Sequence, residues 1–225
     1  MLVLFDIDGT MLSSEGVGVR SMEEVGEVLY GKRFSLKGIS IGGRLDPLIW
    51  NDICQKYGIS NPEARHDEFK STYIEILQKN INEVSVNIFA GVSALIDRCC
   101  EHEDVTLGIA TGNYEETGKM KLLAAGIDSS IFTANAWGLD GTVRADLPKF
   151  ALSQCQTHKH VVLLGDTVHD VTSGQANGCK TIAVCTGSHD RDTLKASNPD
   201  LLLEDLSDVK EVFQWIMQFH NEDYQ

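Results

Sequence analysis

Residues 2–10 read LVLFDIDGT, and this stretch decides the fold. Four apolar residues followed by polar residues and a glycine are typical of a buried strand in a parallel sheet. Comparable apolar runs follow further along the chain. The longer ones span residues 105–110, 160–164 and 181–185, and shorter ones span 131–134 and 201–203. These runs are the strands that the sequence predicts.

Helical patterns alternate with these runs from about residue 91 onward. Ser207 is the expected N-cap of the last helix. The alternation predicts an α/β fold, with a Rossmann-like parallel sheet core and helices on both faces. Apolar residues recur at helical spacing in three stretches: Val92, Leu95, Ile96 and Cys99; Met120, Leu123 and Ala124; and Val209, Val212, Phe213 and Ile216.

Residues 14–88 break this alternation, because they carry helical patterns and few strand signals. Asp46-Pro47 and Asn61-Pro62 each place a capping residue before a first-turn proline, so each predicts the start of a helix. We expect residues 14–88 to form an inserted α-helical cap, and residues 1–13 and 89–225 to form the α/β core.

The charge balance limits the classes of partner. The chain has 33 acidic and 19 basic residues and a formal net charge of −14. Nucleic-acid backbones and anionic membrane surfaces favour a basic face, so we expect neither as a partner. A small anionic ligand could still bind where a metal ion or a cluster of N–H groups reverses the local field.

No stretch of the sequence carries a targeting or membrane signal. The apolar runs fall well short of the roughly 20 residues of a membrane-spanning helix. Asp6 and Asp8 fall where the apolar part of a secretory signal would lie. The six cysteines show neither paired metal-binding spacing nor a compact disulfide framework. We therefore expect a cytoplasmic protein with reduced thiols, either a monomer or a homodimer.

Polar residues follow three of the predicted strands at the point where each strand ends. Asp6 and Asp8 follow the first, Thr111 follows the second, and Asp166 follows the third, with Asp170 four residues later. Ligands bind at the carboxyl ends of the strands in open α/β sheets, so these residues should converge on one site. Neighbouring carboxylates repel one another unless a cation lies between them. The sequence therefore predicts a Mg²⁺ site, since Mg²⁺ is the usual cation beside phosphate groups.

Asp6 and Asp8 stand two residues apart, so their side chains point the same way in an extended chain. One of them could act as a nucleophile, since carboxylates attack phosphorus to form an aspartyl phosphate. The other could transfer a proton. Gly9 permits a sharp turn, and the N–H groups after Asp6, as far as Thr10, could bind phosphate oxygens.

A second set of phosphate donors follows the second strand. Thr111 offers its hydroxyl, and Gly112 and Asn113 offer their N–H groups. Asn113 also precedes a predicted helix, whose positive end favours anions. These groups favour a phosphate ester as the substrate.

The chain resembles the haloacid dehalogenase (HAD) superfamily of hydrolases, in particular its phosphoglycolate phosphatase-like branch, over nearly its whole length. The resemblance is carried by the motifs DIDGT at 6–10, ATGN at 110–113 and GDTVHD at 165–170, in this order and at these intervals. It implies that Asp6 is the nucleophile and a metal ligand. It also implies that Asp8 is the general acid and then the general base, with its backbone carbonyl on the metal.

The resemblance assigns roles to the other strand ends as well. Thr111 would bind the phosphoryl group, Asp166 would ligate Mg²⁺, and Asp170 would complete or orient the metal shell. His169 lies on the turn between these two carboxylates. We interpret His169 as a solvated or cap-facing residue and not as an acid–base group.

The family also places a basic residue near the helix that leads into the third strand, where it steadies the nucleophile and the phosphate. Both Arg144 and Lys149 stand in this region. Arg144 is the better fit, because it lies shortly before the expected N-cap Asp146 and because an arginine can hold a phosphate oxygen in a fork. Lys149 is the alternative, since lysine is the residue that most members use.

The helical cap would close over the site and select the substrate. Its glycine-rich loop at residues 38–44 ends at Arg44, which is a candidate substrate contact. The resemblance implies a phosphatase that acts on a small phosphorylated metabolite, with phosphoglycolate named by analogy only. A phosphomutase of the β-phosphoglucomutase type and a non-catalytic regulator on the same fold stay open as alternatives. A dehalogenase is disfavoured because it does not require the acid–base group Asp8.

Overall fold

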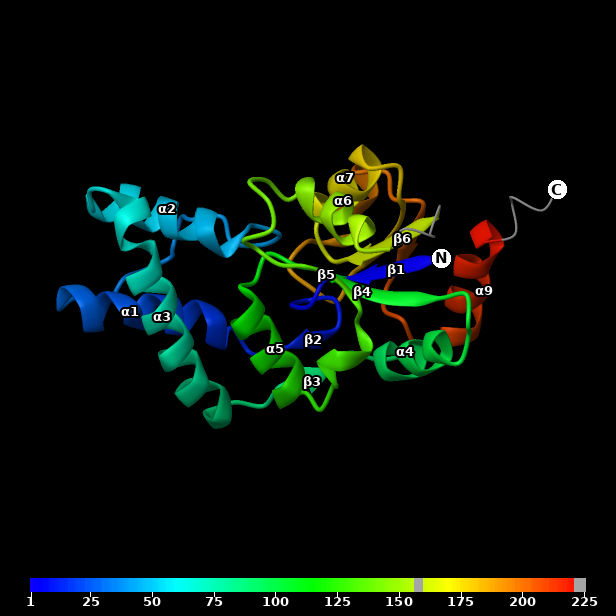
Figure 1. Cartoon of the computed structure of the whole chain (residues 1–225), viewed down its shortest axis with the longest axis horizontal. Helices are drawn as coiled ribbons and strands as arrows, with labels where there is room; N and C mark the ends of the chain where they lie inside the picture. The colour runs from blue at the N-terminus through cyan, green and yellow to red at the C-terminus, as the bar shows by residue number, and fades with distance from the viewer. Residues whose placement is uncertain (156–159, 221–225) are drawn as a thin grey trace.

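The computed structural model describes residues 1–155 and 160–220. Its core is one parallel sheet of six strands in the order β5-β4-β1-β6-β7-β8. Figure 1 labels β1, β4, β5 and β6 of this sheet. This architecture confirms the predicted Rossmann-like α/β fold. The strands are β1 (Leu2–Phe5), β4 (Thr106–Ala110), β5 (Ala134–Ala136), β6 (Val161–Gly165), β7 (Lys180–Val184) and β8 (Leu201–Leu203).

One predicted strand, at residues 131–134, is wrong in position. The chain forms a 3-10 turn, η2, at Ser129–Ile131, and β5 begins only at Ala134. Asp128 caps this turn, because its carboxylate accepts a hydrogen bond from the N–H of Ser130 at 2.9 Å. The cap stabilises a turn where the apolar pattern alone indicates an extended chain.

Helices cover both faces of the sheet. Val3 and Phe5 pack against the hydrophobic cluster that includes α4 and α9, whereas Leu2 and Leu4 pack against the cluster that includes α6. Successive side chains of a strand point to opposite faces, so β1 is apolar at every position because both of its faces are buried. The helices are α4 (Val92–Cys100), α5 (Glu115–Ala124), α6 (Asp146–Ser153), α7 (Val168–Ala176), α8 (Arg191–Ala196) and α9 (Val209–His220).

Two details of these helices differ from the predictions. Asp208, and not Ser207, caps α9, because the Asp208 carboxylate accepts a hydrogen bond from the N–H of Glu211 at 3.1 Å. In α5, Leu123 is 78% exposed, whereas Lys121 is buried at 4%. A charged side chain therefore lies on the inward face of α5, where the sequence pattern indicates an apolar one.

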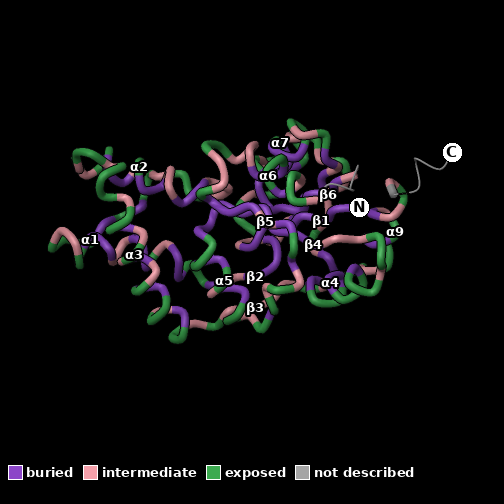
Figure 2. Tube along the Cα trace, viewed as in Figure 1, coloured by how far each residue is buried: buried purple, intermediate pink, exposed green. Residues whose placement is uncertain are grey.

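Three further helices lie beyond the carboxyl ends of the strands (Figure 1). They are α1 (Val17–Tyr30), α2 (Asp46–Tyr57) and α3 (Pro62–Asn80), and the 3-10 turn η1 (Ile81–Glu83) follows them. These helices share a hydrophobic cluster of their own, in which the rings of Trp50 and Phe69 stack with their centroids 4.3 Å apart. Figure 2 shows buried residues both in the sheet and within this helical group. Within residues 1–155 and 160–220, no helix has the length and apolar character needed to cross a membrane.

The chain passes between the sheet and the helical group through a short ribbon. Strand β2 (Leu12–Ser13) pairs in the antiparallel direction with β3 (Asn87–Ile88). The outgoing and returning segments therefore lie side by side. The division into a cap at 14–88 and a core at 1–13 and 89–225 stays a prediction.

The start of α2 differs from the predicted cap. The helix begins at Asp46, with Leu45 as its N-cap residue. The carboxylate of Asp46 instead accepts a hydrogen bond from the N–H of Tyr114 at 3.0 Å, next to the start of α5. Asn61 is the N-cap residue of α3 as predicted, but it has a left-handed backbone and its side chain makes no capping hydrogen bond.

Candidate active site

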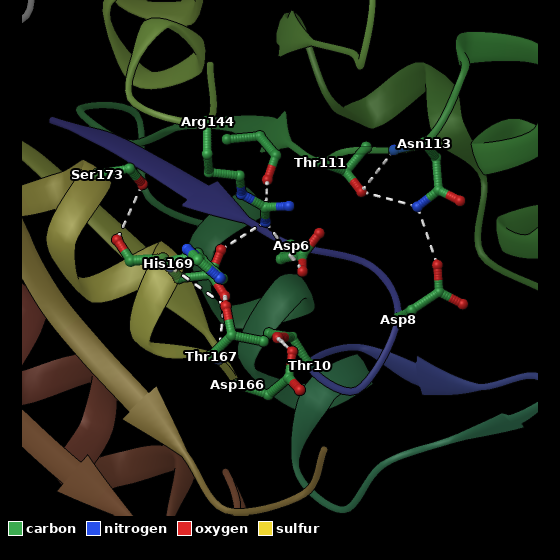
Figure 3. A network of polar contacts seen from close by, with 12 residues as sticks. Asp6, Asp8, Thr10, Thr111, Asn113, Arg144, Asp166, Thr167, His169 and Ser173 are labelled. Atoms are coloured by element: carbon green, nitrogen blue, oxygen red, sulfur yellow. Dashed lines mark hydrogen bonds and ion pairs between the residues drawn. The ribbon is translucent and has the colours of Figure 1, made fainter. Parts of the chain in front are cut away.

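A cavity of about 450 Å³ lies at the carboxyl ends of the strands, between the sheet and the helical group. Asp6 and Thr111 line it from the sheet, and Val19 and Ile49 line it from α1 and α2. Figure 3 shows the polar contacts at its base, which come from the loops after β1, β4 and β6. The three strand ends that the sequence analysis singled out therefore meet in one place.

Asp6 is held at the base of this cavity by Arg144. The Nη2 atom of Arg144 lies 3.0 Å from Oδ2 of Asp6 and 2.5 Å from Oδ1 of Asp170 (Figure 3). Burial raises the pKa of Asp6 to about 6, the charge of Arg144 opposes this rise, and the nearby Asp170 adds to it. Arg144 thus favours the ionised form of Asp6, which is the form that can act as a nucleophile.

Asp6, Asp166 and Asp170 form a cluster that suits a metal ion. All three are buried, and each offers an oxygen within 4.8 Å of the others. Burial raises the pKa of Asp166 to about 7, and the charges of Asp170 and Asp6 raise it further. The guanidinium of Arg144 pairs with Asp6 and Asp170, and its charge has a smaller effect on Asp166. A divalent cation with a preference for oxygen ligands, such as Mg²⁺, fits this set because it offsets their mutual repulsion.

Asp166 and Asp170 are each fixed by neighbouring groups. Asp166 accepts hydrogen bonds from the N–H of Ser188 at 2.9 Å and from the hydroxyl of Thr10 at 3.3 Å. Asp170 accepts from the N–H and the hydroxyl of Thr167, at 3.1 and 2.6 Å, and so completes a capping box at the start of α7.

Thr10 differs from its prediction as a substrate-binding residue. Its side chain is buried and directed to Asp166, and it lies outside the set of residues that line the cavity. Gly9 does line the cavity, with a positive φ of 79°. A side chain at Gly9 would collide with the carboxylate of Asp166, because a Cβ would lie 2.5 Å from Oδ2. The turn therefore needs a glycine for both reasons.

Asp8 faces a different set of partners from Asp6. Its Oδ2 atom accepts hydrogen bonds from Nδ2 of Asn113 at 2.9 Å and from Nζ of Lys121 at 2.6 Å, and Ser14 contacts its Oδ1 atom at 3.3 Å. Burial opposes the ionisation of Asp8, but the ion pair with Lys121 and these hydrogen bonds outweigh it and lower its pKa. Asp8 is therefore ionised at neutral pH in the free protein.

The loop after β4 contributes Thr111, Gly112 and Asn113. Thr111 is buried, and its hydroxyl oxygen accepts a hydrogen bond from Nδ2 of Asn113 at 2.8 Å. The carbonyl of Gly112 accepts a hydrogen bond from the N–H of Asp46 at 2.8 Å. A Cβ on Gly112 would lie only 1.9 Å from the carbonyl oxygen of Arg44, so the glycine-rich loop reaches the site only because residue 112 has no side chain.

The two candidate basic residues have different surroundings. Arg144 lines the cavity and contacts Asp6, as described above. Lys149 is exposed on α6 and lies outside the set of residues that line the cavity. Lys149 was wrong as a catalytic candidate, because the turn before α6 directs Arg144 and not Lys149 toward β1.

Arg44 and His169 lie where the helical group meets the core. Arg44 lines the cavity, and its Nη2 atom forms an ion pair with Asp52 at 2.6 Å. His169 is exposed and packs beside the glycine-rich loop, since a Cβ on Gly43 would lie 2.8 Å from its Cβ. This position agrees with the interpretation of His169 as a cap-facing residue.

Two residues of the site were missed by the sequence analysis. Lys121 lies ten residues after Thr111 on α5, and Asp46 was interpreted only as a helix cap. Burial raises the pKa of Asp46 to about 7, while Lys121 opposes this rise. Lys121 is buried on the inward face of α5, where a lysine needs a charged partner, but its pairing with Asp8 is visible only in the folded chain.

Comparisons with known proteins agree with this geometry. A family model described as haloacid dehalogenase-like hydrolase matches residues 3–184. A pyrophosphatase PpaX from Bacillus pumilus (strain SAFR-032) is 29% identical over 222 residues, which cover 92% of this chain and 93% of that protein.

Two solved structures share the fold. A hydrolase from Pseudomonas syringae has a TM-score of 0.73 at 16% identity, covering 95% of this chain and 98% of that one. A predicted phosphoglycolate phosphatase from Haemophilus somnus 129pt has a TM-score of 0.70 at 19% identity, covering 95% and 97% of the two chains. Because the family model spans most of the sequence, the chain belongs to the haloacid dehalogenase-like hydrolase family.

Proposed function

We propose that this protein is a Mg²⁺-dependent phosphatase that hydrolyses phosphomonoesters of small metabolites through an aspartyl phosphate on Asp6. The observation that carries the proposal is the set of charged groups around the Asp6 carboxylate. It lines the cavity 3.0 Å from Arg144, and oxygens of Asp166 and Asp170 complete a cluster within 4.8 Å. A nucleophile, a cation site and a guanidinium thus meet at one point.

In the first step, an oxygen of Asp6 attacks the phosphorus, and the bond from phosphorus to the ester oxygen breaks. The bonding electron pair goes to the ester oxygen, which takes a proton from Asp8. The pKa of Asp8 is lowered in the free protein, despite burial, by Lys121 and its hydrogen bonds. Asp8 therefore has to take up this proton on substrate binding, for example from the monoanion of the ester.

In the second step, a water molecule attacks the phosphorus of the aspartyl phosphate. Asp8, now ionised, accepts a proton from the water. The bond between phosphorus and Asp6 breaks, inorganic phosphate leaves, and the carboxylate of Asp6 is restored. Arg144 remains beside Asp6 and can donate hydrogen bonds to the transferring phosphoryl oxygens in both steps.

Asp6 and Asp166 are the residues that would hold the cation, with the backbone carbonyl of Asp8. Both oxygens of Asp170 already accept hydrogen bonds from Arg144 and Thr167, so we assign Asp170 the orienting role. Bound Mg²⁺ supplies positive charge that offsets the carboxylates and the phosphate.

The substrate within this class is open to direct test. The cavity of about 450 Å³ suits a small metabolite, and Val19, Met22 and Ile49 make part of its wall apolar. Phosphoglycolate is the substrate that the sequence resemblance suggests, and pyrophosphate stands in the name of the bacterial relative. Both compounds therefore belong in a substrate panel with sugar phosphates and simple alkyl phosphates.

The test is the release of inorganic phosphate from this panel by the purified protein with Mg²⁺. Asp6→Asn and an EDTA-treated sample serve as controls, and we expect each to lose nearly all activity. Release that persists in Asp6→Asn would contradict the aspartyl-phosphate route. Release that requires an added sugar bisphosphate, with a sugar phosphate isomer as the product, would favour the phosphomutase instead. Folded protein that hydrolyses nothing would favour a binding role.

A further inference from the structure

Lys121, Asp8 and Asn113 contact one another at the active site, and the reaction proposed above gives Lys121 no role. Its Nζ atom lies 2.6 Å from Oδ2 of Asp8 and 2.6 Å from Oδ1 of Asn113. Nδ2 of Asn113 donates to the same Asp8 oxygen at 2.9 Å. Each of the three side chains therefore bonds to the other two.

The ammonium of Lys121 is almost completely removed from water. The residue is 4% exposed, and its side chain is 5% exposed, whereas the side chain of Asp8 is 40% exposed. A buried lysine is costly unless its charge is paired. Lys121 is thus the more deeply buried partner in this ion pair, and Asp8 is the more exposed one.

Two helices of the helical group also lie next to the ammonium of Lys121. A Cβ on Gly18 of α1 would lie 3.3 Å from Nζ of Lys121 and 3.1 Å from the hydroxyl oxygen of Tyr73 of α3. Gly18 lies in the first turn of α1, and a larger residue there would press on both of these atoms. The burial of Lys121 therefore depends in part on α1 and α3 lying over the site.

The two carboxylate oxygens of Asp8 have different hydrogen-bond partners. Oδ2 accepts from both Lys121 and Asn113, whereas Oδ1 makes, among the described residues, a longer contact of 3.3 Å with Ser14. Two strong contacts on one oxygen fix the rotation of the carboxylate. The other oxygen is then the one available for proton transfer with a ligand in the cavity.

We propose that Lys121 is a positioning residue that holds Asp8 in the orientation for proton transfer, and that α1 secures this hold by covering Lys121 through Gly18. The inference rests on the proposed function, because it takes Asp8 as the acid and base of that reaction. The position of α1 would thus affect the proton-transfer group Asp8 through the side chain of Lys121.

Lys121 also lines the cavity, so a competing role is direct binding of an anionic group on the substrate. The two roles differ in which step they affect. A misplaced Asp8 slows the expulsion of a poor leaving group and the attack of water. A lost anion contact weakens only the binding of substrates that carry a second negative charge.

The experiment compares Lys121→Met with wild type on p-nitrophenyl phosphate, a simple alkyl phosphate and phosphoglycolate. The aryl leaving group needs little protonation, so the first turnover should remain fast in the variant while the aspartyl phosphate builds up. We expect a burst of p-nitrophenol, and a steady-state kcat lower by about 10- to 100-fold, since a small misplacement of a catalytic group costs up to about 10²-fold. With the alkyl phosphate, kcat should fall at least as much, without a burst. With p-nitrophenyl phosphate KM should fall along with kcat, because an accumulated intermediate lowers both. With the alkyl phosphate and phosphoglycolate KM should change little.

The matched control is Lys119→Met, because Lys119 stands on the same helix, is exposed and forms a surface ion pair with Glu115 at 2.6 Å. It should behave as wild type. A Lys121→Met protein with a raised KM for phosphoglycolate alone and an unchanged kcat would overturn the positioning role in favour of anion binding. Unchanged kinetics on every substrate would overturn both roles.

A second variant keeps Lys121 itself. Gly18→Ala adds one methyl group against Nζ and should reproduce the burst pattern with a smaller loss of kcat. Val28→Ala, at a position of the same helix that is 61% exposed, is its control. If Lys121→Met does not fold, wild-type kinetics in a folded Gly18→Ala would overturn the coupling to α1. Failure of the proposed function is a separate result, because wild type would then release no phosphate or Asp6→Asn would stay active.

Discussion

The carboxylate of Asp46 in α2 accepts a hydrogen bond from the backbone N–H of Tyr114, 3.0 Å away, next to the start of α5. A side chain of the helical group therefore caps a helix of the core, 68 positions later in the sequence. The backbone makes a second link beside it, from the N–H of Asp46 to the carbonyl of Gly112 at 2.8 Å. These bonds join α2 to the loop that carries Thr111.

This link predicts a difference between two substitutions of Asp46. Asp46→Ala removes the acceptor and should lower the free energy of unfolding by about 0.5–2 kcal/mol, as the loss of a capping side chain does. Asp46→Asn keeps an acceptor oxygen and removes a buried charge, so it should be at least as stable as wild type at pH 7.5. Thermal or denaturant unfolding of both variants checks the prediction. Equal destabilisation by the two substitutions would show that the charge of Asp46, and not its hydrogen bond, contributes to the free energy of unfolding.

The raised pKa values of the buried carboxylates predict how the stability of the metal-free protein depends on pH. Burial raises the pKa to about 6 for Asp6, and to about 7 for Asp46 and Asp166. Such groups bind more protons in the folded than in the unfolded state between about pH 4 and 7, so stability falls as the pH rises through this range. The EDTA-treated protein should therefore melt at a higher temperature at pH 5 than at pH 7.5.

Added Mg²⁺ should reverse this trend, because it stabilises the ionised carboxylates. The rise in melting temperature on addition of Mg²⁺ should be larger at pH 7.5 than at pH 5, at about 2–4 °C per kcal/mol of stabilisation. Asp166→Asn should reduce that rise, whereas the exposed control Asp128→Asn should not. An equal effect of Mg²⁺ at both pH values would contradict the carboxylate site.

Arg144 and Lys149 give a matched pair of basic residues. Arg144 contacts both Asp6 and Asp170 from a side chain that is 10% exposed, whereas Lys149 is exposed. Removal of one partner of a buried ion pair costs about 3–5 kcal/mol. Arg144→Met should therefore lower both stability and kcat, by at least about 100-fold for kcat, which corresponds to about 2.7 kcal/mol. Lys149→Met should change kcat less than about twofold, and steady-state kinetics on the best substrate of the panel decides between them.

Two glycine-to-alanine substitutions should have different effects, because one creates a collision with a neighbouring loop and the other only strains the backbone. Gly112→Ala would place a Cβ 1.9 Å from the carbonyl oxygen of Arg44, so the glycine-rich loop has to move away from the cavity. We expect KM to rise by about 10-fold or more, equivalent to about 1.4 kcal/mol of binding. Gly126→Ala is the control, because Gly126 has a positive φ but no atom near the added Cβ. It should cost stability without an effect on KM.

The sequence predicted the strand ends well because their signal is local. An apolar run that ends at Asp6 or Asp166 indicates a strand, its end and its polar residue within a few positions. The parallel order of the sheet then brings those ends together. The position of Arg144 was predicted as the better of two alternatives, and the turn before α6 explains why it reaches Asp6 and Lys149 does not.

The residues that were missed depend on contacts between distant segments. The spacing of apolar residues on α5 favoured Leu123 as an inward position, and nothing near Lys121 in sequence indicates its pairing with Asp8. Asp46 before Pro47 has the pattern of a helix cap, and only the folded chain brings Tyr114 to it. Local patterns predict elements, but they do not predict which side chains from separate elements meet.

The ribbon of β2 and β3 has a consequence for how such a chain can diversify. Leu12 pairs with Ile88 and Ser13 with Asn87, so the chain leaves the sheet and returns to it at the same point. The length and sequence of the intervening segment therefore do not enter the register of the sheet. A segment of different size could be exchanged between these two positions while Asp6, Asp166 and Asp170 keep their places. The residues at the strand ends could therefore stay constant in a lineage while the segment proposed to select the substrate changes.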